Sequence, residues 1–121
     1  CANYNMWSYG LETLNPYARR VGVNAIKQIY ASRKILYVAG TKMAHNEAAS
    51  DPNCVKALQG KNRIERMKNY QIYLHNIFGE DADKNQTFSL VPKAGYDAKA
   101  VLGSPCGIAI LFGDGYCAGS P

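Results

Sequence analysis

Ile35-Leu36-Tyr37-Val38-Ala39-Gly40 is a continuous apolar run that ends on a glycine, and this stretch decides the fold class. Strands in parallel sheets are covered on both faces, so they are apolar throughout and do not alternate. The run is therefore predicted to be a buried parallel strand. A second strand is predicted over residues 87–93, where two sets of side chains alternate: Phe88, Leu90 and Pro92 with Ser89, Val91 and Lys93.

Helical signals lie before, between and after these two strands. Asn15 is a suitable N-cap for a helix over residues 16–29, where apolar residues recur at helical spacing. A longer amphipathic helix is predicted over residues 62–78, followed by an acidic turn over residues 80–86. The last element, residues 98–112, is predicted to be helical in its second half.

The order helix, strand, helix, strand, helix predicts an α/β fold in which the strands are parallel and the helices cross over the sheet. Fully apolar parallel strands require neighbouring strands on both sides and helices on both faces. Two such strands leave free edges. We therefore expect this chain to be one part of a larger structure.

The length of the chain and its charge distribution limit the classes of protein to which it can belong. The chain has 121 residues, which is one small domain with a modest core. Its formal net charge is +5, but the basic residues are scattered and form no dense block, which argues against nucleic-acid binding. The longest apolar stretch, residues 107–112, is too short to span a bilayer. No cofactor is predicted.

The four cysteines, Cys1, Cys54, Cys106 and Cys117, are widely spaced. Zinc sites favour close cysteine or histidine pairs, so two disulfides in an oxidising compartment are the better interpretation and no metal is predicted. Three pairings are possible. Cys1 with Cys54 and Cys106 with Cys117 is favoured, because the short glycine-rich path between the last two can fold back on itself.

Two further features predict a secreted, extracellular protein. Asn85-Gln86-Thr87 is an N-glycosylation sequon in a predicted polar loop, so Asn85 is a candidate glycosylation site. The first residue is Cys1, with no initiator methionine and no signal-like apolar segment, which predicts a processed or excised chain.

Several segments, in this order, carry a family resemblance: Tyr4-Asn5-x-Trp7-x-Tyr9-Gly10-Leu11, Tyr37-Val38-Ala39-Gly40, Gln59-Gly60-Lys61-Asn62-Arg63-Ile64-Glu65-Arg66, and Gly95-Tyr96-Asp97 with Gly103-Ser104-Pro105-Cys106-Gly107. Their order and spacing resemble secreted α/β-hydrolase-like proteins of unassigned substrate across nearly the whole chain. The resemblance implies that residues 1–121 are the C-terminal part of an α/β-hydrolase-like domain. The two predicted strands would be its seventh and eighth, and the part that bears the nucleophile would lie outside this chain.

The resemblance also implies that the catalytic triad is degenerate. The nucleophile of such enzymes lies in a Gly-x-Ser-x-Gly turn, and this chain has none. The acid should follow the seventh strand, where Thr41 and Met43 stand and no carboxylate occurs before Glu47. Tyr96 takes the place of the histidine, and a phenol with an ordinary pKa of about 10 is a poor base at neutral pH.

Other candidate residues have simpler interpretations. His45 could act with Glu47 or Asp51, but an exposed loop histidine explains it better. His75 is predicted to be a partly buried, hydrogen-bonded ring on the long helix. Asp81, Asp83 and Asn85 have the spacing of a calcium-binding loop. Gln86 and Pro92 stand where an EF-hand needs glycine and glutamate, so an EF-hand is excluded.

These observations predict a non-catalytic, secreted α/β-hydrolase-like protein with a binding or structural-assembly role. Its expected partner is the N-terminal half of the fold, as a second chain or subunit. A homo-oligomer or a filament of this chain is the other possible assembly, because a truncated sheet leaves an edge strand with which another copy could pair. From the resemblance, Arg63 and Arg66 with Glu65 form a charged face that docks on carboxylates. The alternative is a divergent serine esterase or lipase-like hydrolase whose nucleophile is supplied by another chain.

Overall fold

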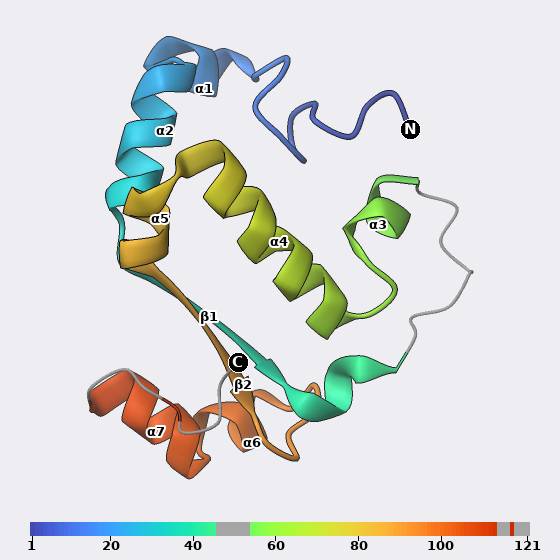
Figure 1. Ribbon diagram of the computed structural model, residues 1–121, viewed down its shortest axis with the longest axis vertical. Helices are drawn as coiled ribbons and strands as arrows, with labels where there is room; N and C mark the ends of the chain where they lie inside the picture. The colour runs from blue at the N-terminus through green and yellow to red at the C-terminus, as the bar shows by residue number, and fades with distance from the viewer. Residues whose placement is uncertain (46–53, 114–116, 118–121) are drawn as a thin grey trace.

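The computed structural model describes residues 1–45, 54–113 and 117, and it is a mixed α/β protein (Figure 1). Its elements, in chain order, are α1 (Pro16–Val21), α2 (Val23–Ser32), β1 (Ile35–Gly40), the 3-10 helix η1 (Thr41–Ala44), α3 (Cys54–Gln59), α4 (Arg63–Phe78), α5 (Glu80–Asn85), β2 (Gln86–Val91), α6 (Ala98–Leu102) and α7 (Pro105–Phe112).

Strands β1 and β2 form a small parallel sheet, as the apolar pattern predicts. The register pairs Ile35 with Gln86 at one end and Gly40 with Val91 at the other. The predicted second strand was wrong at its C-terminal end, because β2 stops at Val91. Proline has no amide hydrogen to donate, and the residue after Pro92 has a φ of 61°, which turns the chain out of the extended conformation.

The predicted helix starts are confirmed by their caps. Asn15 Oδ1 accepts a hydrogen bond from the Ala18 amide at 2.8 Å, and Asn62 Oδ1 accepts one from the Glu65 amide at 2.9 Å. The first helix differs from the prediction, because it is interrupted at Gly22, whose φ of 85° is outside the helical region. Two helices, α1 and α2, therefore replace one.

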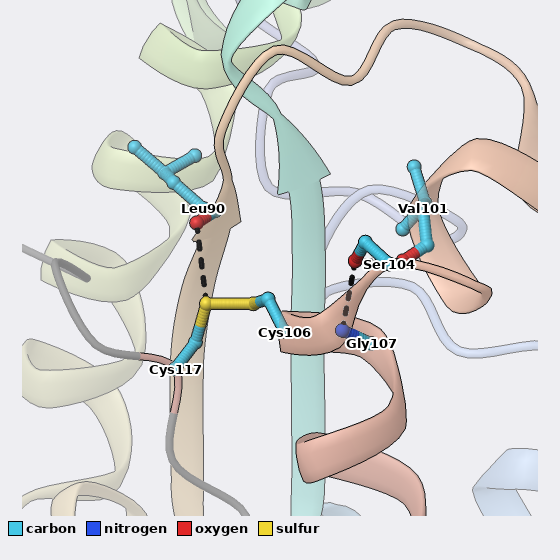
Figure 2. Close-up of a disulfide and its surroundings, with 6 residues drawn as sticks. All are labelled: Leu90, Val101, Ser104, Cys106, Gly107 and Cys117. Atoms are coloured by element: carbon cyan, nitrogen blue, oxygen red, sulfur yellow. Dashed lines mark hydrogen bonds between the residues drawn. A yellow bond between two sulfur atoms is a disulfide. The ribbon is translucent and has the colours of Figure 1, made fainter.

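Two further expectations need correction. The predicted acidic turn is helix α5, because carboxylates in its first turn are stabilised by the helix dipole and Ala82 is buried beneath it. The second half of the last element is helical, as predicted (α7), but its first half also forms a helix, α6. Ser104 separates them, since its hydroxyl donates to the Val101 carbonyl at 2.7 Å and accepts from the Gly107 amide at 2.9 Å (Figure 2).

The sheet lies between groups of helices. In Figure 1, α4 lies on one side of the two strands and α6 and α7 lie on the other. A core cluster of Val91, Ala94 and Val101 fills the space between β2 and α6. Within the described part of the chain, no helix is both long enough and apolar enough to cross a membrane.

Two disulfides join distant parts of the chain, in the pairing that the sequence favours. Cys1–Cys54 attaches the N-terminal segment to α3, and Cys106–Cys117 attaches Cys117 to α7. Residue spacing alone leaves all three pairings of the four cysteines possible. Such bonds fit an oxidising, extracellular compartment.

Candidate functional site

The carboxyl ends of β1 and β2 bring two loops together, residues 41–45 and residues 93–96. The Lys93 amide donates to Thr41 Oγ1 at 2.8 Å, and the Lys42 amide donates to the Ala94 carbonyl at 2.9 Å. In open sheets with parallel strands, ligands commonly bind beyond the carboxyl ends of the strands. These loops are therefore the first place to search for a site.

Gly40 allows the two loops to approach so closely. A Cβ atom at this position would lie 2.2 Å from the Ala94 carbonyl oxygen and 2.5 Å from its carbon. Real Cβ atoms do not come that near to backbone atoms, so only glycine fits the end of β1. The contact fixes the position of residues 41–45 relative to residues 93–96.

The residues at the predicted triad positions lie at this end of the sheet. Thr41 uses its hydroxyl to hold the Lys93 amide, and Met43 packs against the core cluster. Tyr96 is 51% exposed, and its ring lies 5.5 Å from the His45 ring. The Arg63 guanidinium carbon lies 5.8 Å from the Tyr96 ring centroid, within the range of a cation–π contact.

His45 is exposed, as predicted, and its Nδ1 lies 3.4 Å from the Lys42 carbonyl oxygen. The acids proposed to act with it, Glu47 and Asp51, lie outside the described residues. Thr41, Met43 and Tyr96 offer a hydroxyl, a thioether and a phenol. This set can donate hydrogen bonds and pack against apolar groups, and it includes no carboxylate or imidazole.

A groove of about 640 Å³ runs from this end of the sheet along β1. One wall is formed by the consecutive residues 36–39 of β1. The other is formed by α4 through side chains at helical spacing: Arg63, Arg66, Met67 and Tyr70. Met43 and Tyr96 also line it. Its volume lies within the ordinary range for ligand sites in proteins, about 300–1,000 Å³.

The two ends of the groove differ in charge. Tyr70 contacts Tyr37 within the strand, whereas Arg63 lies beside Tyr96 beyond the carboxyl ends of the strands, so α4 is antiparallel to β1. Both arginines therefore lie toward the carboxyl end of β1. Arg66 is oriented by a hydrogen bond from its Nε to the Gly60 carbonyl at 2.9 Å. The groove is aromatic at one end and basic at the other.

The aromatic end is built from tyrosines whose hydroxyl groups converge. The Tyr30 hydroxyl is hydrogen-bonded to that of Tyr37 and, at 2.8 Å, to that of Tyr70. The Tyr37 hydroxyl donates to Gln86 Oε1 at 3.1 Å. The Tyr37 ring also stacks on Phe88, with the centroids 4.5 Å apart. This network joins α2, β1, α4 and β2.

The direction of the network follows from one bond. Gln86 Nε2 donates to the Tyr30 carbonyl at 2.9 Å, so Oε1 faces Tyr37 and can only accept. Each hydroxyl has one hydrogen. Tyr37 gives its hydrogen to Gln86, so Tyr30 must donate to Tyr37 and Tyr70 must donate to Tyr30. The hydrogen bonds therefore run one way, from Tyr70 to the buried amide of Gln86.

These phenols stay protonated at neutral pH. Burial, together with hydrogen bonding to Tyr30, raises the pKa of Tyr37 and the pKa of Tyr70 above the ordinary value for tyrosine. Burial also raises the pKa of Tyr73, with a smaller contribution from Tyr4. A phenol with a raised pKa is neither a base nor a nucleophile near pH 7.

The other predicted residues lie away from the groove. Asn85 Nδ2 donates to the Ala31 carbonyl at 3.0 Å and to the Asp81 carbonyl at 2.9 Å, and its glycosylation stays a prediction. His75 is more exposed than predicted, and its Nδ1 lies 2.6 Å from Asp83 Oδ2. Across residues 1–45, 54–113 and 117, no three His, Cys, Asp or Glu side chains group as metal ligands.

Sequence reasoning missed both the groove and the tyrosine network. One signal was present, since the chain has nine tyrosines and only three phenylalanines. That surplus does not reveal which hydroxyl groups meet, because Tyr30, Tyr37 and Tyr70 come from three separate elements. Comparison of the chain with protein-family models, with curated proteins and with solved structures found no match.

Proposed function

We propose that this chain is a non-catalytic binding protein that assembles with a second polypeptide in an extracellular compartment. The observation that carries the proposal is the groove of about 640 Å³ between β1 and α4, which is lined by packing groups and protonated phenols. A binding role needs such a surface. A hydrolytic role needs a nucleophile, a base and an acid, and the described side chains that line the groove supply none of them.

A second apolar surface supports an assembly role. Ile108, Leu111 and Phe112 of α7 are 51%, 53% and 84% exposed. Apolar side chains gathered on one short helix are a common feature of protein–protein contacts. The sheet of only two parallel strands supports the same proposal, because parallel sheets are ordinarily covered on both faces and extended by further strands.

The α/β-hydrolase-like origin of the chain belongs to the same proposal. Parallel strands that end in loops carrying Thr41, Met43 and Tyr96 are compatible with a degenerate triad at the carboxyl end of a larger sheet. In that case the polypeptide that contacts this chain would carry the remaining strands. The two disulfides are compatible with secretion.

Two assays on native, unreduced material test the absence of catalysis. We expect no turnover of p-nitrophenyl esters and no labelling by a fluorophosphonate, for the wild-type chain and for Tyr96→His. The Tyr96→His imidazole would have no carboxylate at position 41 or 43 to orient it, so it should not restore activity. The matched control is Tyr17→His, because Tyr17 is 80% exposed and does not line the groove.

Stoichiometric fluorophosphonate labelling of the native complex would contradict the proposal. It would favour the alternative, a serine esterase or lipase-like enzyme whose nucleophile comes from another chain. The exposed ring of His45, beside Tyr96, is the observation that keeps this alternative in view. His45→Ala would then be expected to abolish the labelling.

A further inference from the structure

The two outer edges of the sheet differ. Beside β2, Cys117 Sγ lies 3.6 Å from the Leu90 carbonyl oxygen (Figure 2). A disulfide sulfur has no hydrogen to donate, so this is a close contact that shields the carbonyl. The disulfide to Cys106 of α7 holds Cys117 in this position. The edge of β2 is therefore obstructed near its carboxyl end.

The opposite edge, on β1, is open to the groove. Successive side chains of a strand point to opposite faces of the sheet, so four consecutive residues line one groove partly through their backbone. Residues 36–39 do so. Among the described residues, the backbone of β1 forms hydrogen bonds only with β2. On its other edge, β1 therefore has no strand partner among the described residues.

We propose that the groove receives an extended segment of another polypeptide, which adds to β1 as a third strand. This inference rests on the proposed binding role and names its partner. The incoming backbone would pair with residues 36–39, a length of about 13 Å at about 3.3 Å per residue, so four to six residues of the segment would be engaged. Its side chains on the α4 side would contact Met67 and Tyr70.

Charge selects the chemistry of the segment. Arg63 and Arg66 line the groove toward the carboxyl end of β1, and the whole chain has a formal net charge of +5. A second copy of the chain would bring the same positive charge to this edge. An acidic segment is attracted to it instead. The expected occupant is therefore a foreign, extended segment of apolar and β-branched residues with carboxylates at the end near Arg63.

A library of random, linear 12-residue peptides displayed on phage tests the proposal on the intact, disulfide-bonded chain. We expect selection to enrich peptides that alternate apolar residues and carry net negative charge. The most enriched peptide would then be synthesised with a fluorescent label, and its affinity measured by anisotropy at two salt concentrations. Affinity should fall at the higher salt concentration, because part of the attraction is between charges.

Backbone methylation distinguishes strand addition from other modes of binding. In an added strand only alternate amides face the neighbouring strand. N-methylation of the peptide at one set of alternate positions should weaken binding about tenfold or more, whereas methylation at the other set should be tolerated. If all positions respond equally, or none respond, the peptide does not pair with β1 and the proposal is overturned.

Protein variants locate the site. Arg63→Gln should weaken the binding of the selected peptide by about threefold or more. Lys68→Gln is the matched control, because Lys68 is an exposed cation on the same helix and does not line the groove. Equal effects of the two variants, or no effect of Arg63→Gln, would overturn the assignment of the acidic end.

The remaining outcomes are also decisive. If no peptide is enriched, the edge does not accept foreign strands and the proposal fails. If light scattering shows a concentration-dependent dimer that competes with the selected peptide, a second copy is the occupant and the acidic foreign partner is wrong. Either result leaves the non-catalytic role standing, because that role is tested separately by fluorophosphonate labelling and ester turnover.

Discussion

The hydroxyl oxygens of Tyr30 and Tyr70 lie 2.8 Å apart, although 40 residues separate them in the chain. This bond ties α2 to α4 and is the outer link of a one-way chain of hydrogen bonds that ends at Gln86, a residue only 4% exposed. The links are not equivalent. Loss of the inner hydroxyl leaves a buried amide oxygen without its donor, whereas loss of the outer one removes only the first donor.

Tyr37→Phe should therefore destabilise the chain more than Tyr70→Phe. Removal of the Tyr37 hydroxyl leaves Gln86 Oε1 without that donor and the Tyr30 hydroxyl without that acceptor, which costs about 1–3 kcal/mol. Tyr70→Phe is the control and should cost about 1 kcal/mol or less. Urea unfolding followed by circular dichroism measures both. Equal losses would contradict the assigned direction of the network.

Alkaline pH should destabilise the folded chain. The pKa of Tyr37 and the pKa of Tyr70 are raised by burial, so between pH 10 and these raised values the folded state binds more protons than the unfolded state. The contribution of these phenols to the free energy of unfolding should therefore be constant below about pH 10 and decline above it. Tyrosinate absorbance at 295 nm should show that three phenols, those of Tyr37, Tyr70 and Tyr73, ionise at higher pH than the others. Ionisation of every tyrosine near pH 10 in the folded protein would contradict this.

Gly40→Ala should be strongly destabilising, because its Cβ would lie 2.2 Å from the Ala94 carbonyl oxygen and the two loops would have to separate. Such overpacking typically costs about 1–3 kcal/mol. Gly95→Ala is the matched control in the facing loop, where the nearest atom to an added Cβ is 3.9 Å away. Thermal unfolding compares the two, and a comparable loss at Gly95 would show that loop flexibility, and not the clash, is responsible.

The two disulfides should contribute unequally. Cys1–Cys54 closes a loop with a sequence separation of 53 residues and Cys106–Cys117 one of 11. Loop entropy in the unfolded chain then predicts that Cys→Ser at both ends costs about 4 kcal/mol for the first bridge and about 3 kcal/mol for the second. Only Cys106→Ser with Cys117→Ser should also increase self-association, since it uncovers β2 near Leu90. Light scattering checks this, and similar association of both double variants would contradict it.

Asn85→Asp should destabilise the chain by about 1–3 kcal/mol, because it places carboxylate oxygen opposite the Ala31 and Asp81 carbonyls. Thr87→Ala also removes the sequon but leaves these two bonds, and Thr87 is exposed, so it should be nearly neutral. Chemical unfolding measures both variants. A glycan on Nδ2 would leave one hydrogen for two carbonyls, so mass spectrometry before and after deglycosylation should accompany the comparison.

Local signals in the sequence determined much of the fold. The apolar run at residues 35–40 is strand β1, and Asn15 caps the helix that it predicts, because capping and strand burial depend on residues that are near in sequence. The same local reasoning failed at residues 80–86, where packing of Ala82 completes a helix that the acidic composition alone does not reveal.

The candidate site was decided by tertiary structure. The sequence predicted that Thr41, Met43 and Tyr96 follow parallel strands, and the parallel pairing of β1 with β2 places them at one end of the sheet. The open edge of β1 could not be predicted in this detail, since it depends on where α4 crosses and on the position of Cys117 beside Leu90 of β2. Contacts between residues far apart in sequence have no local signature, because they are selected by the packing of whole elements and not by the propensity of any single segment.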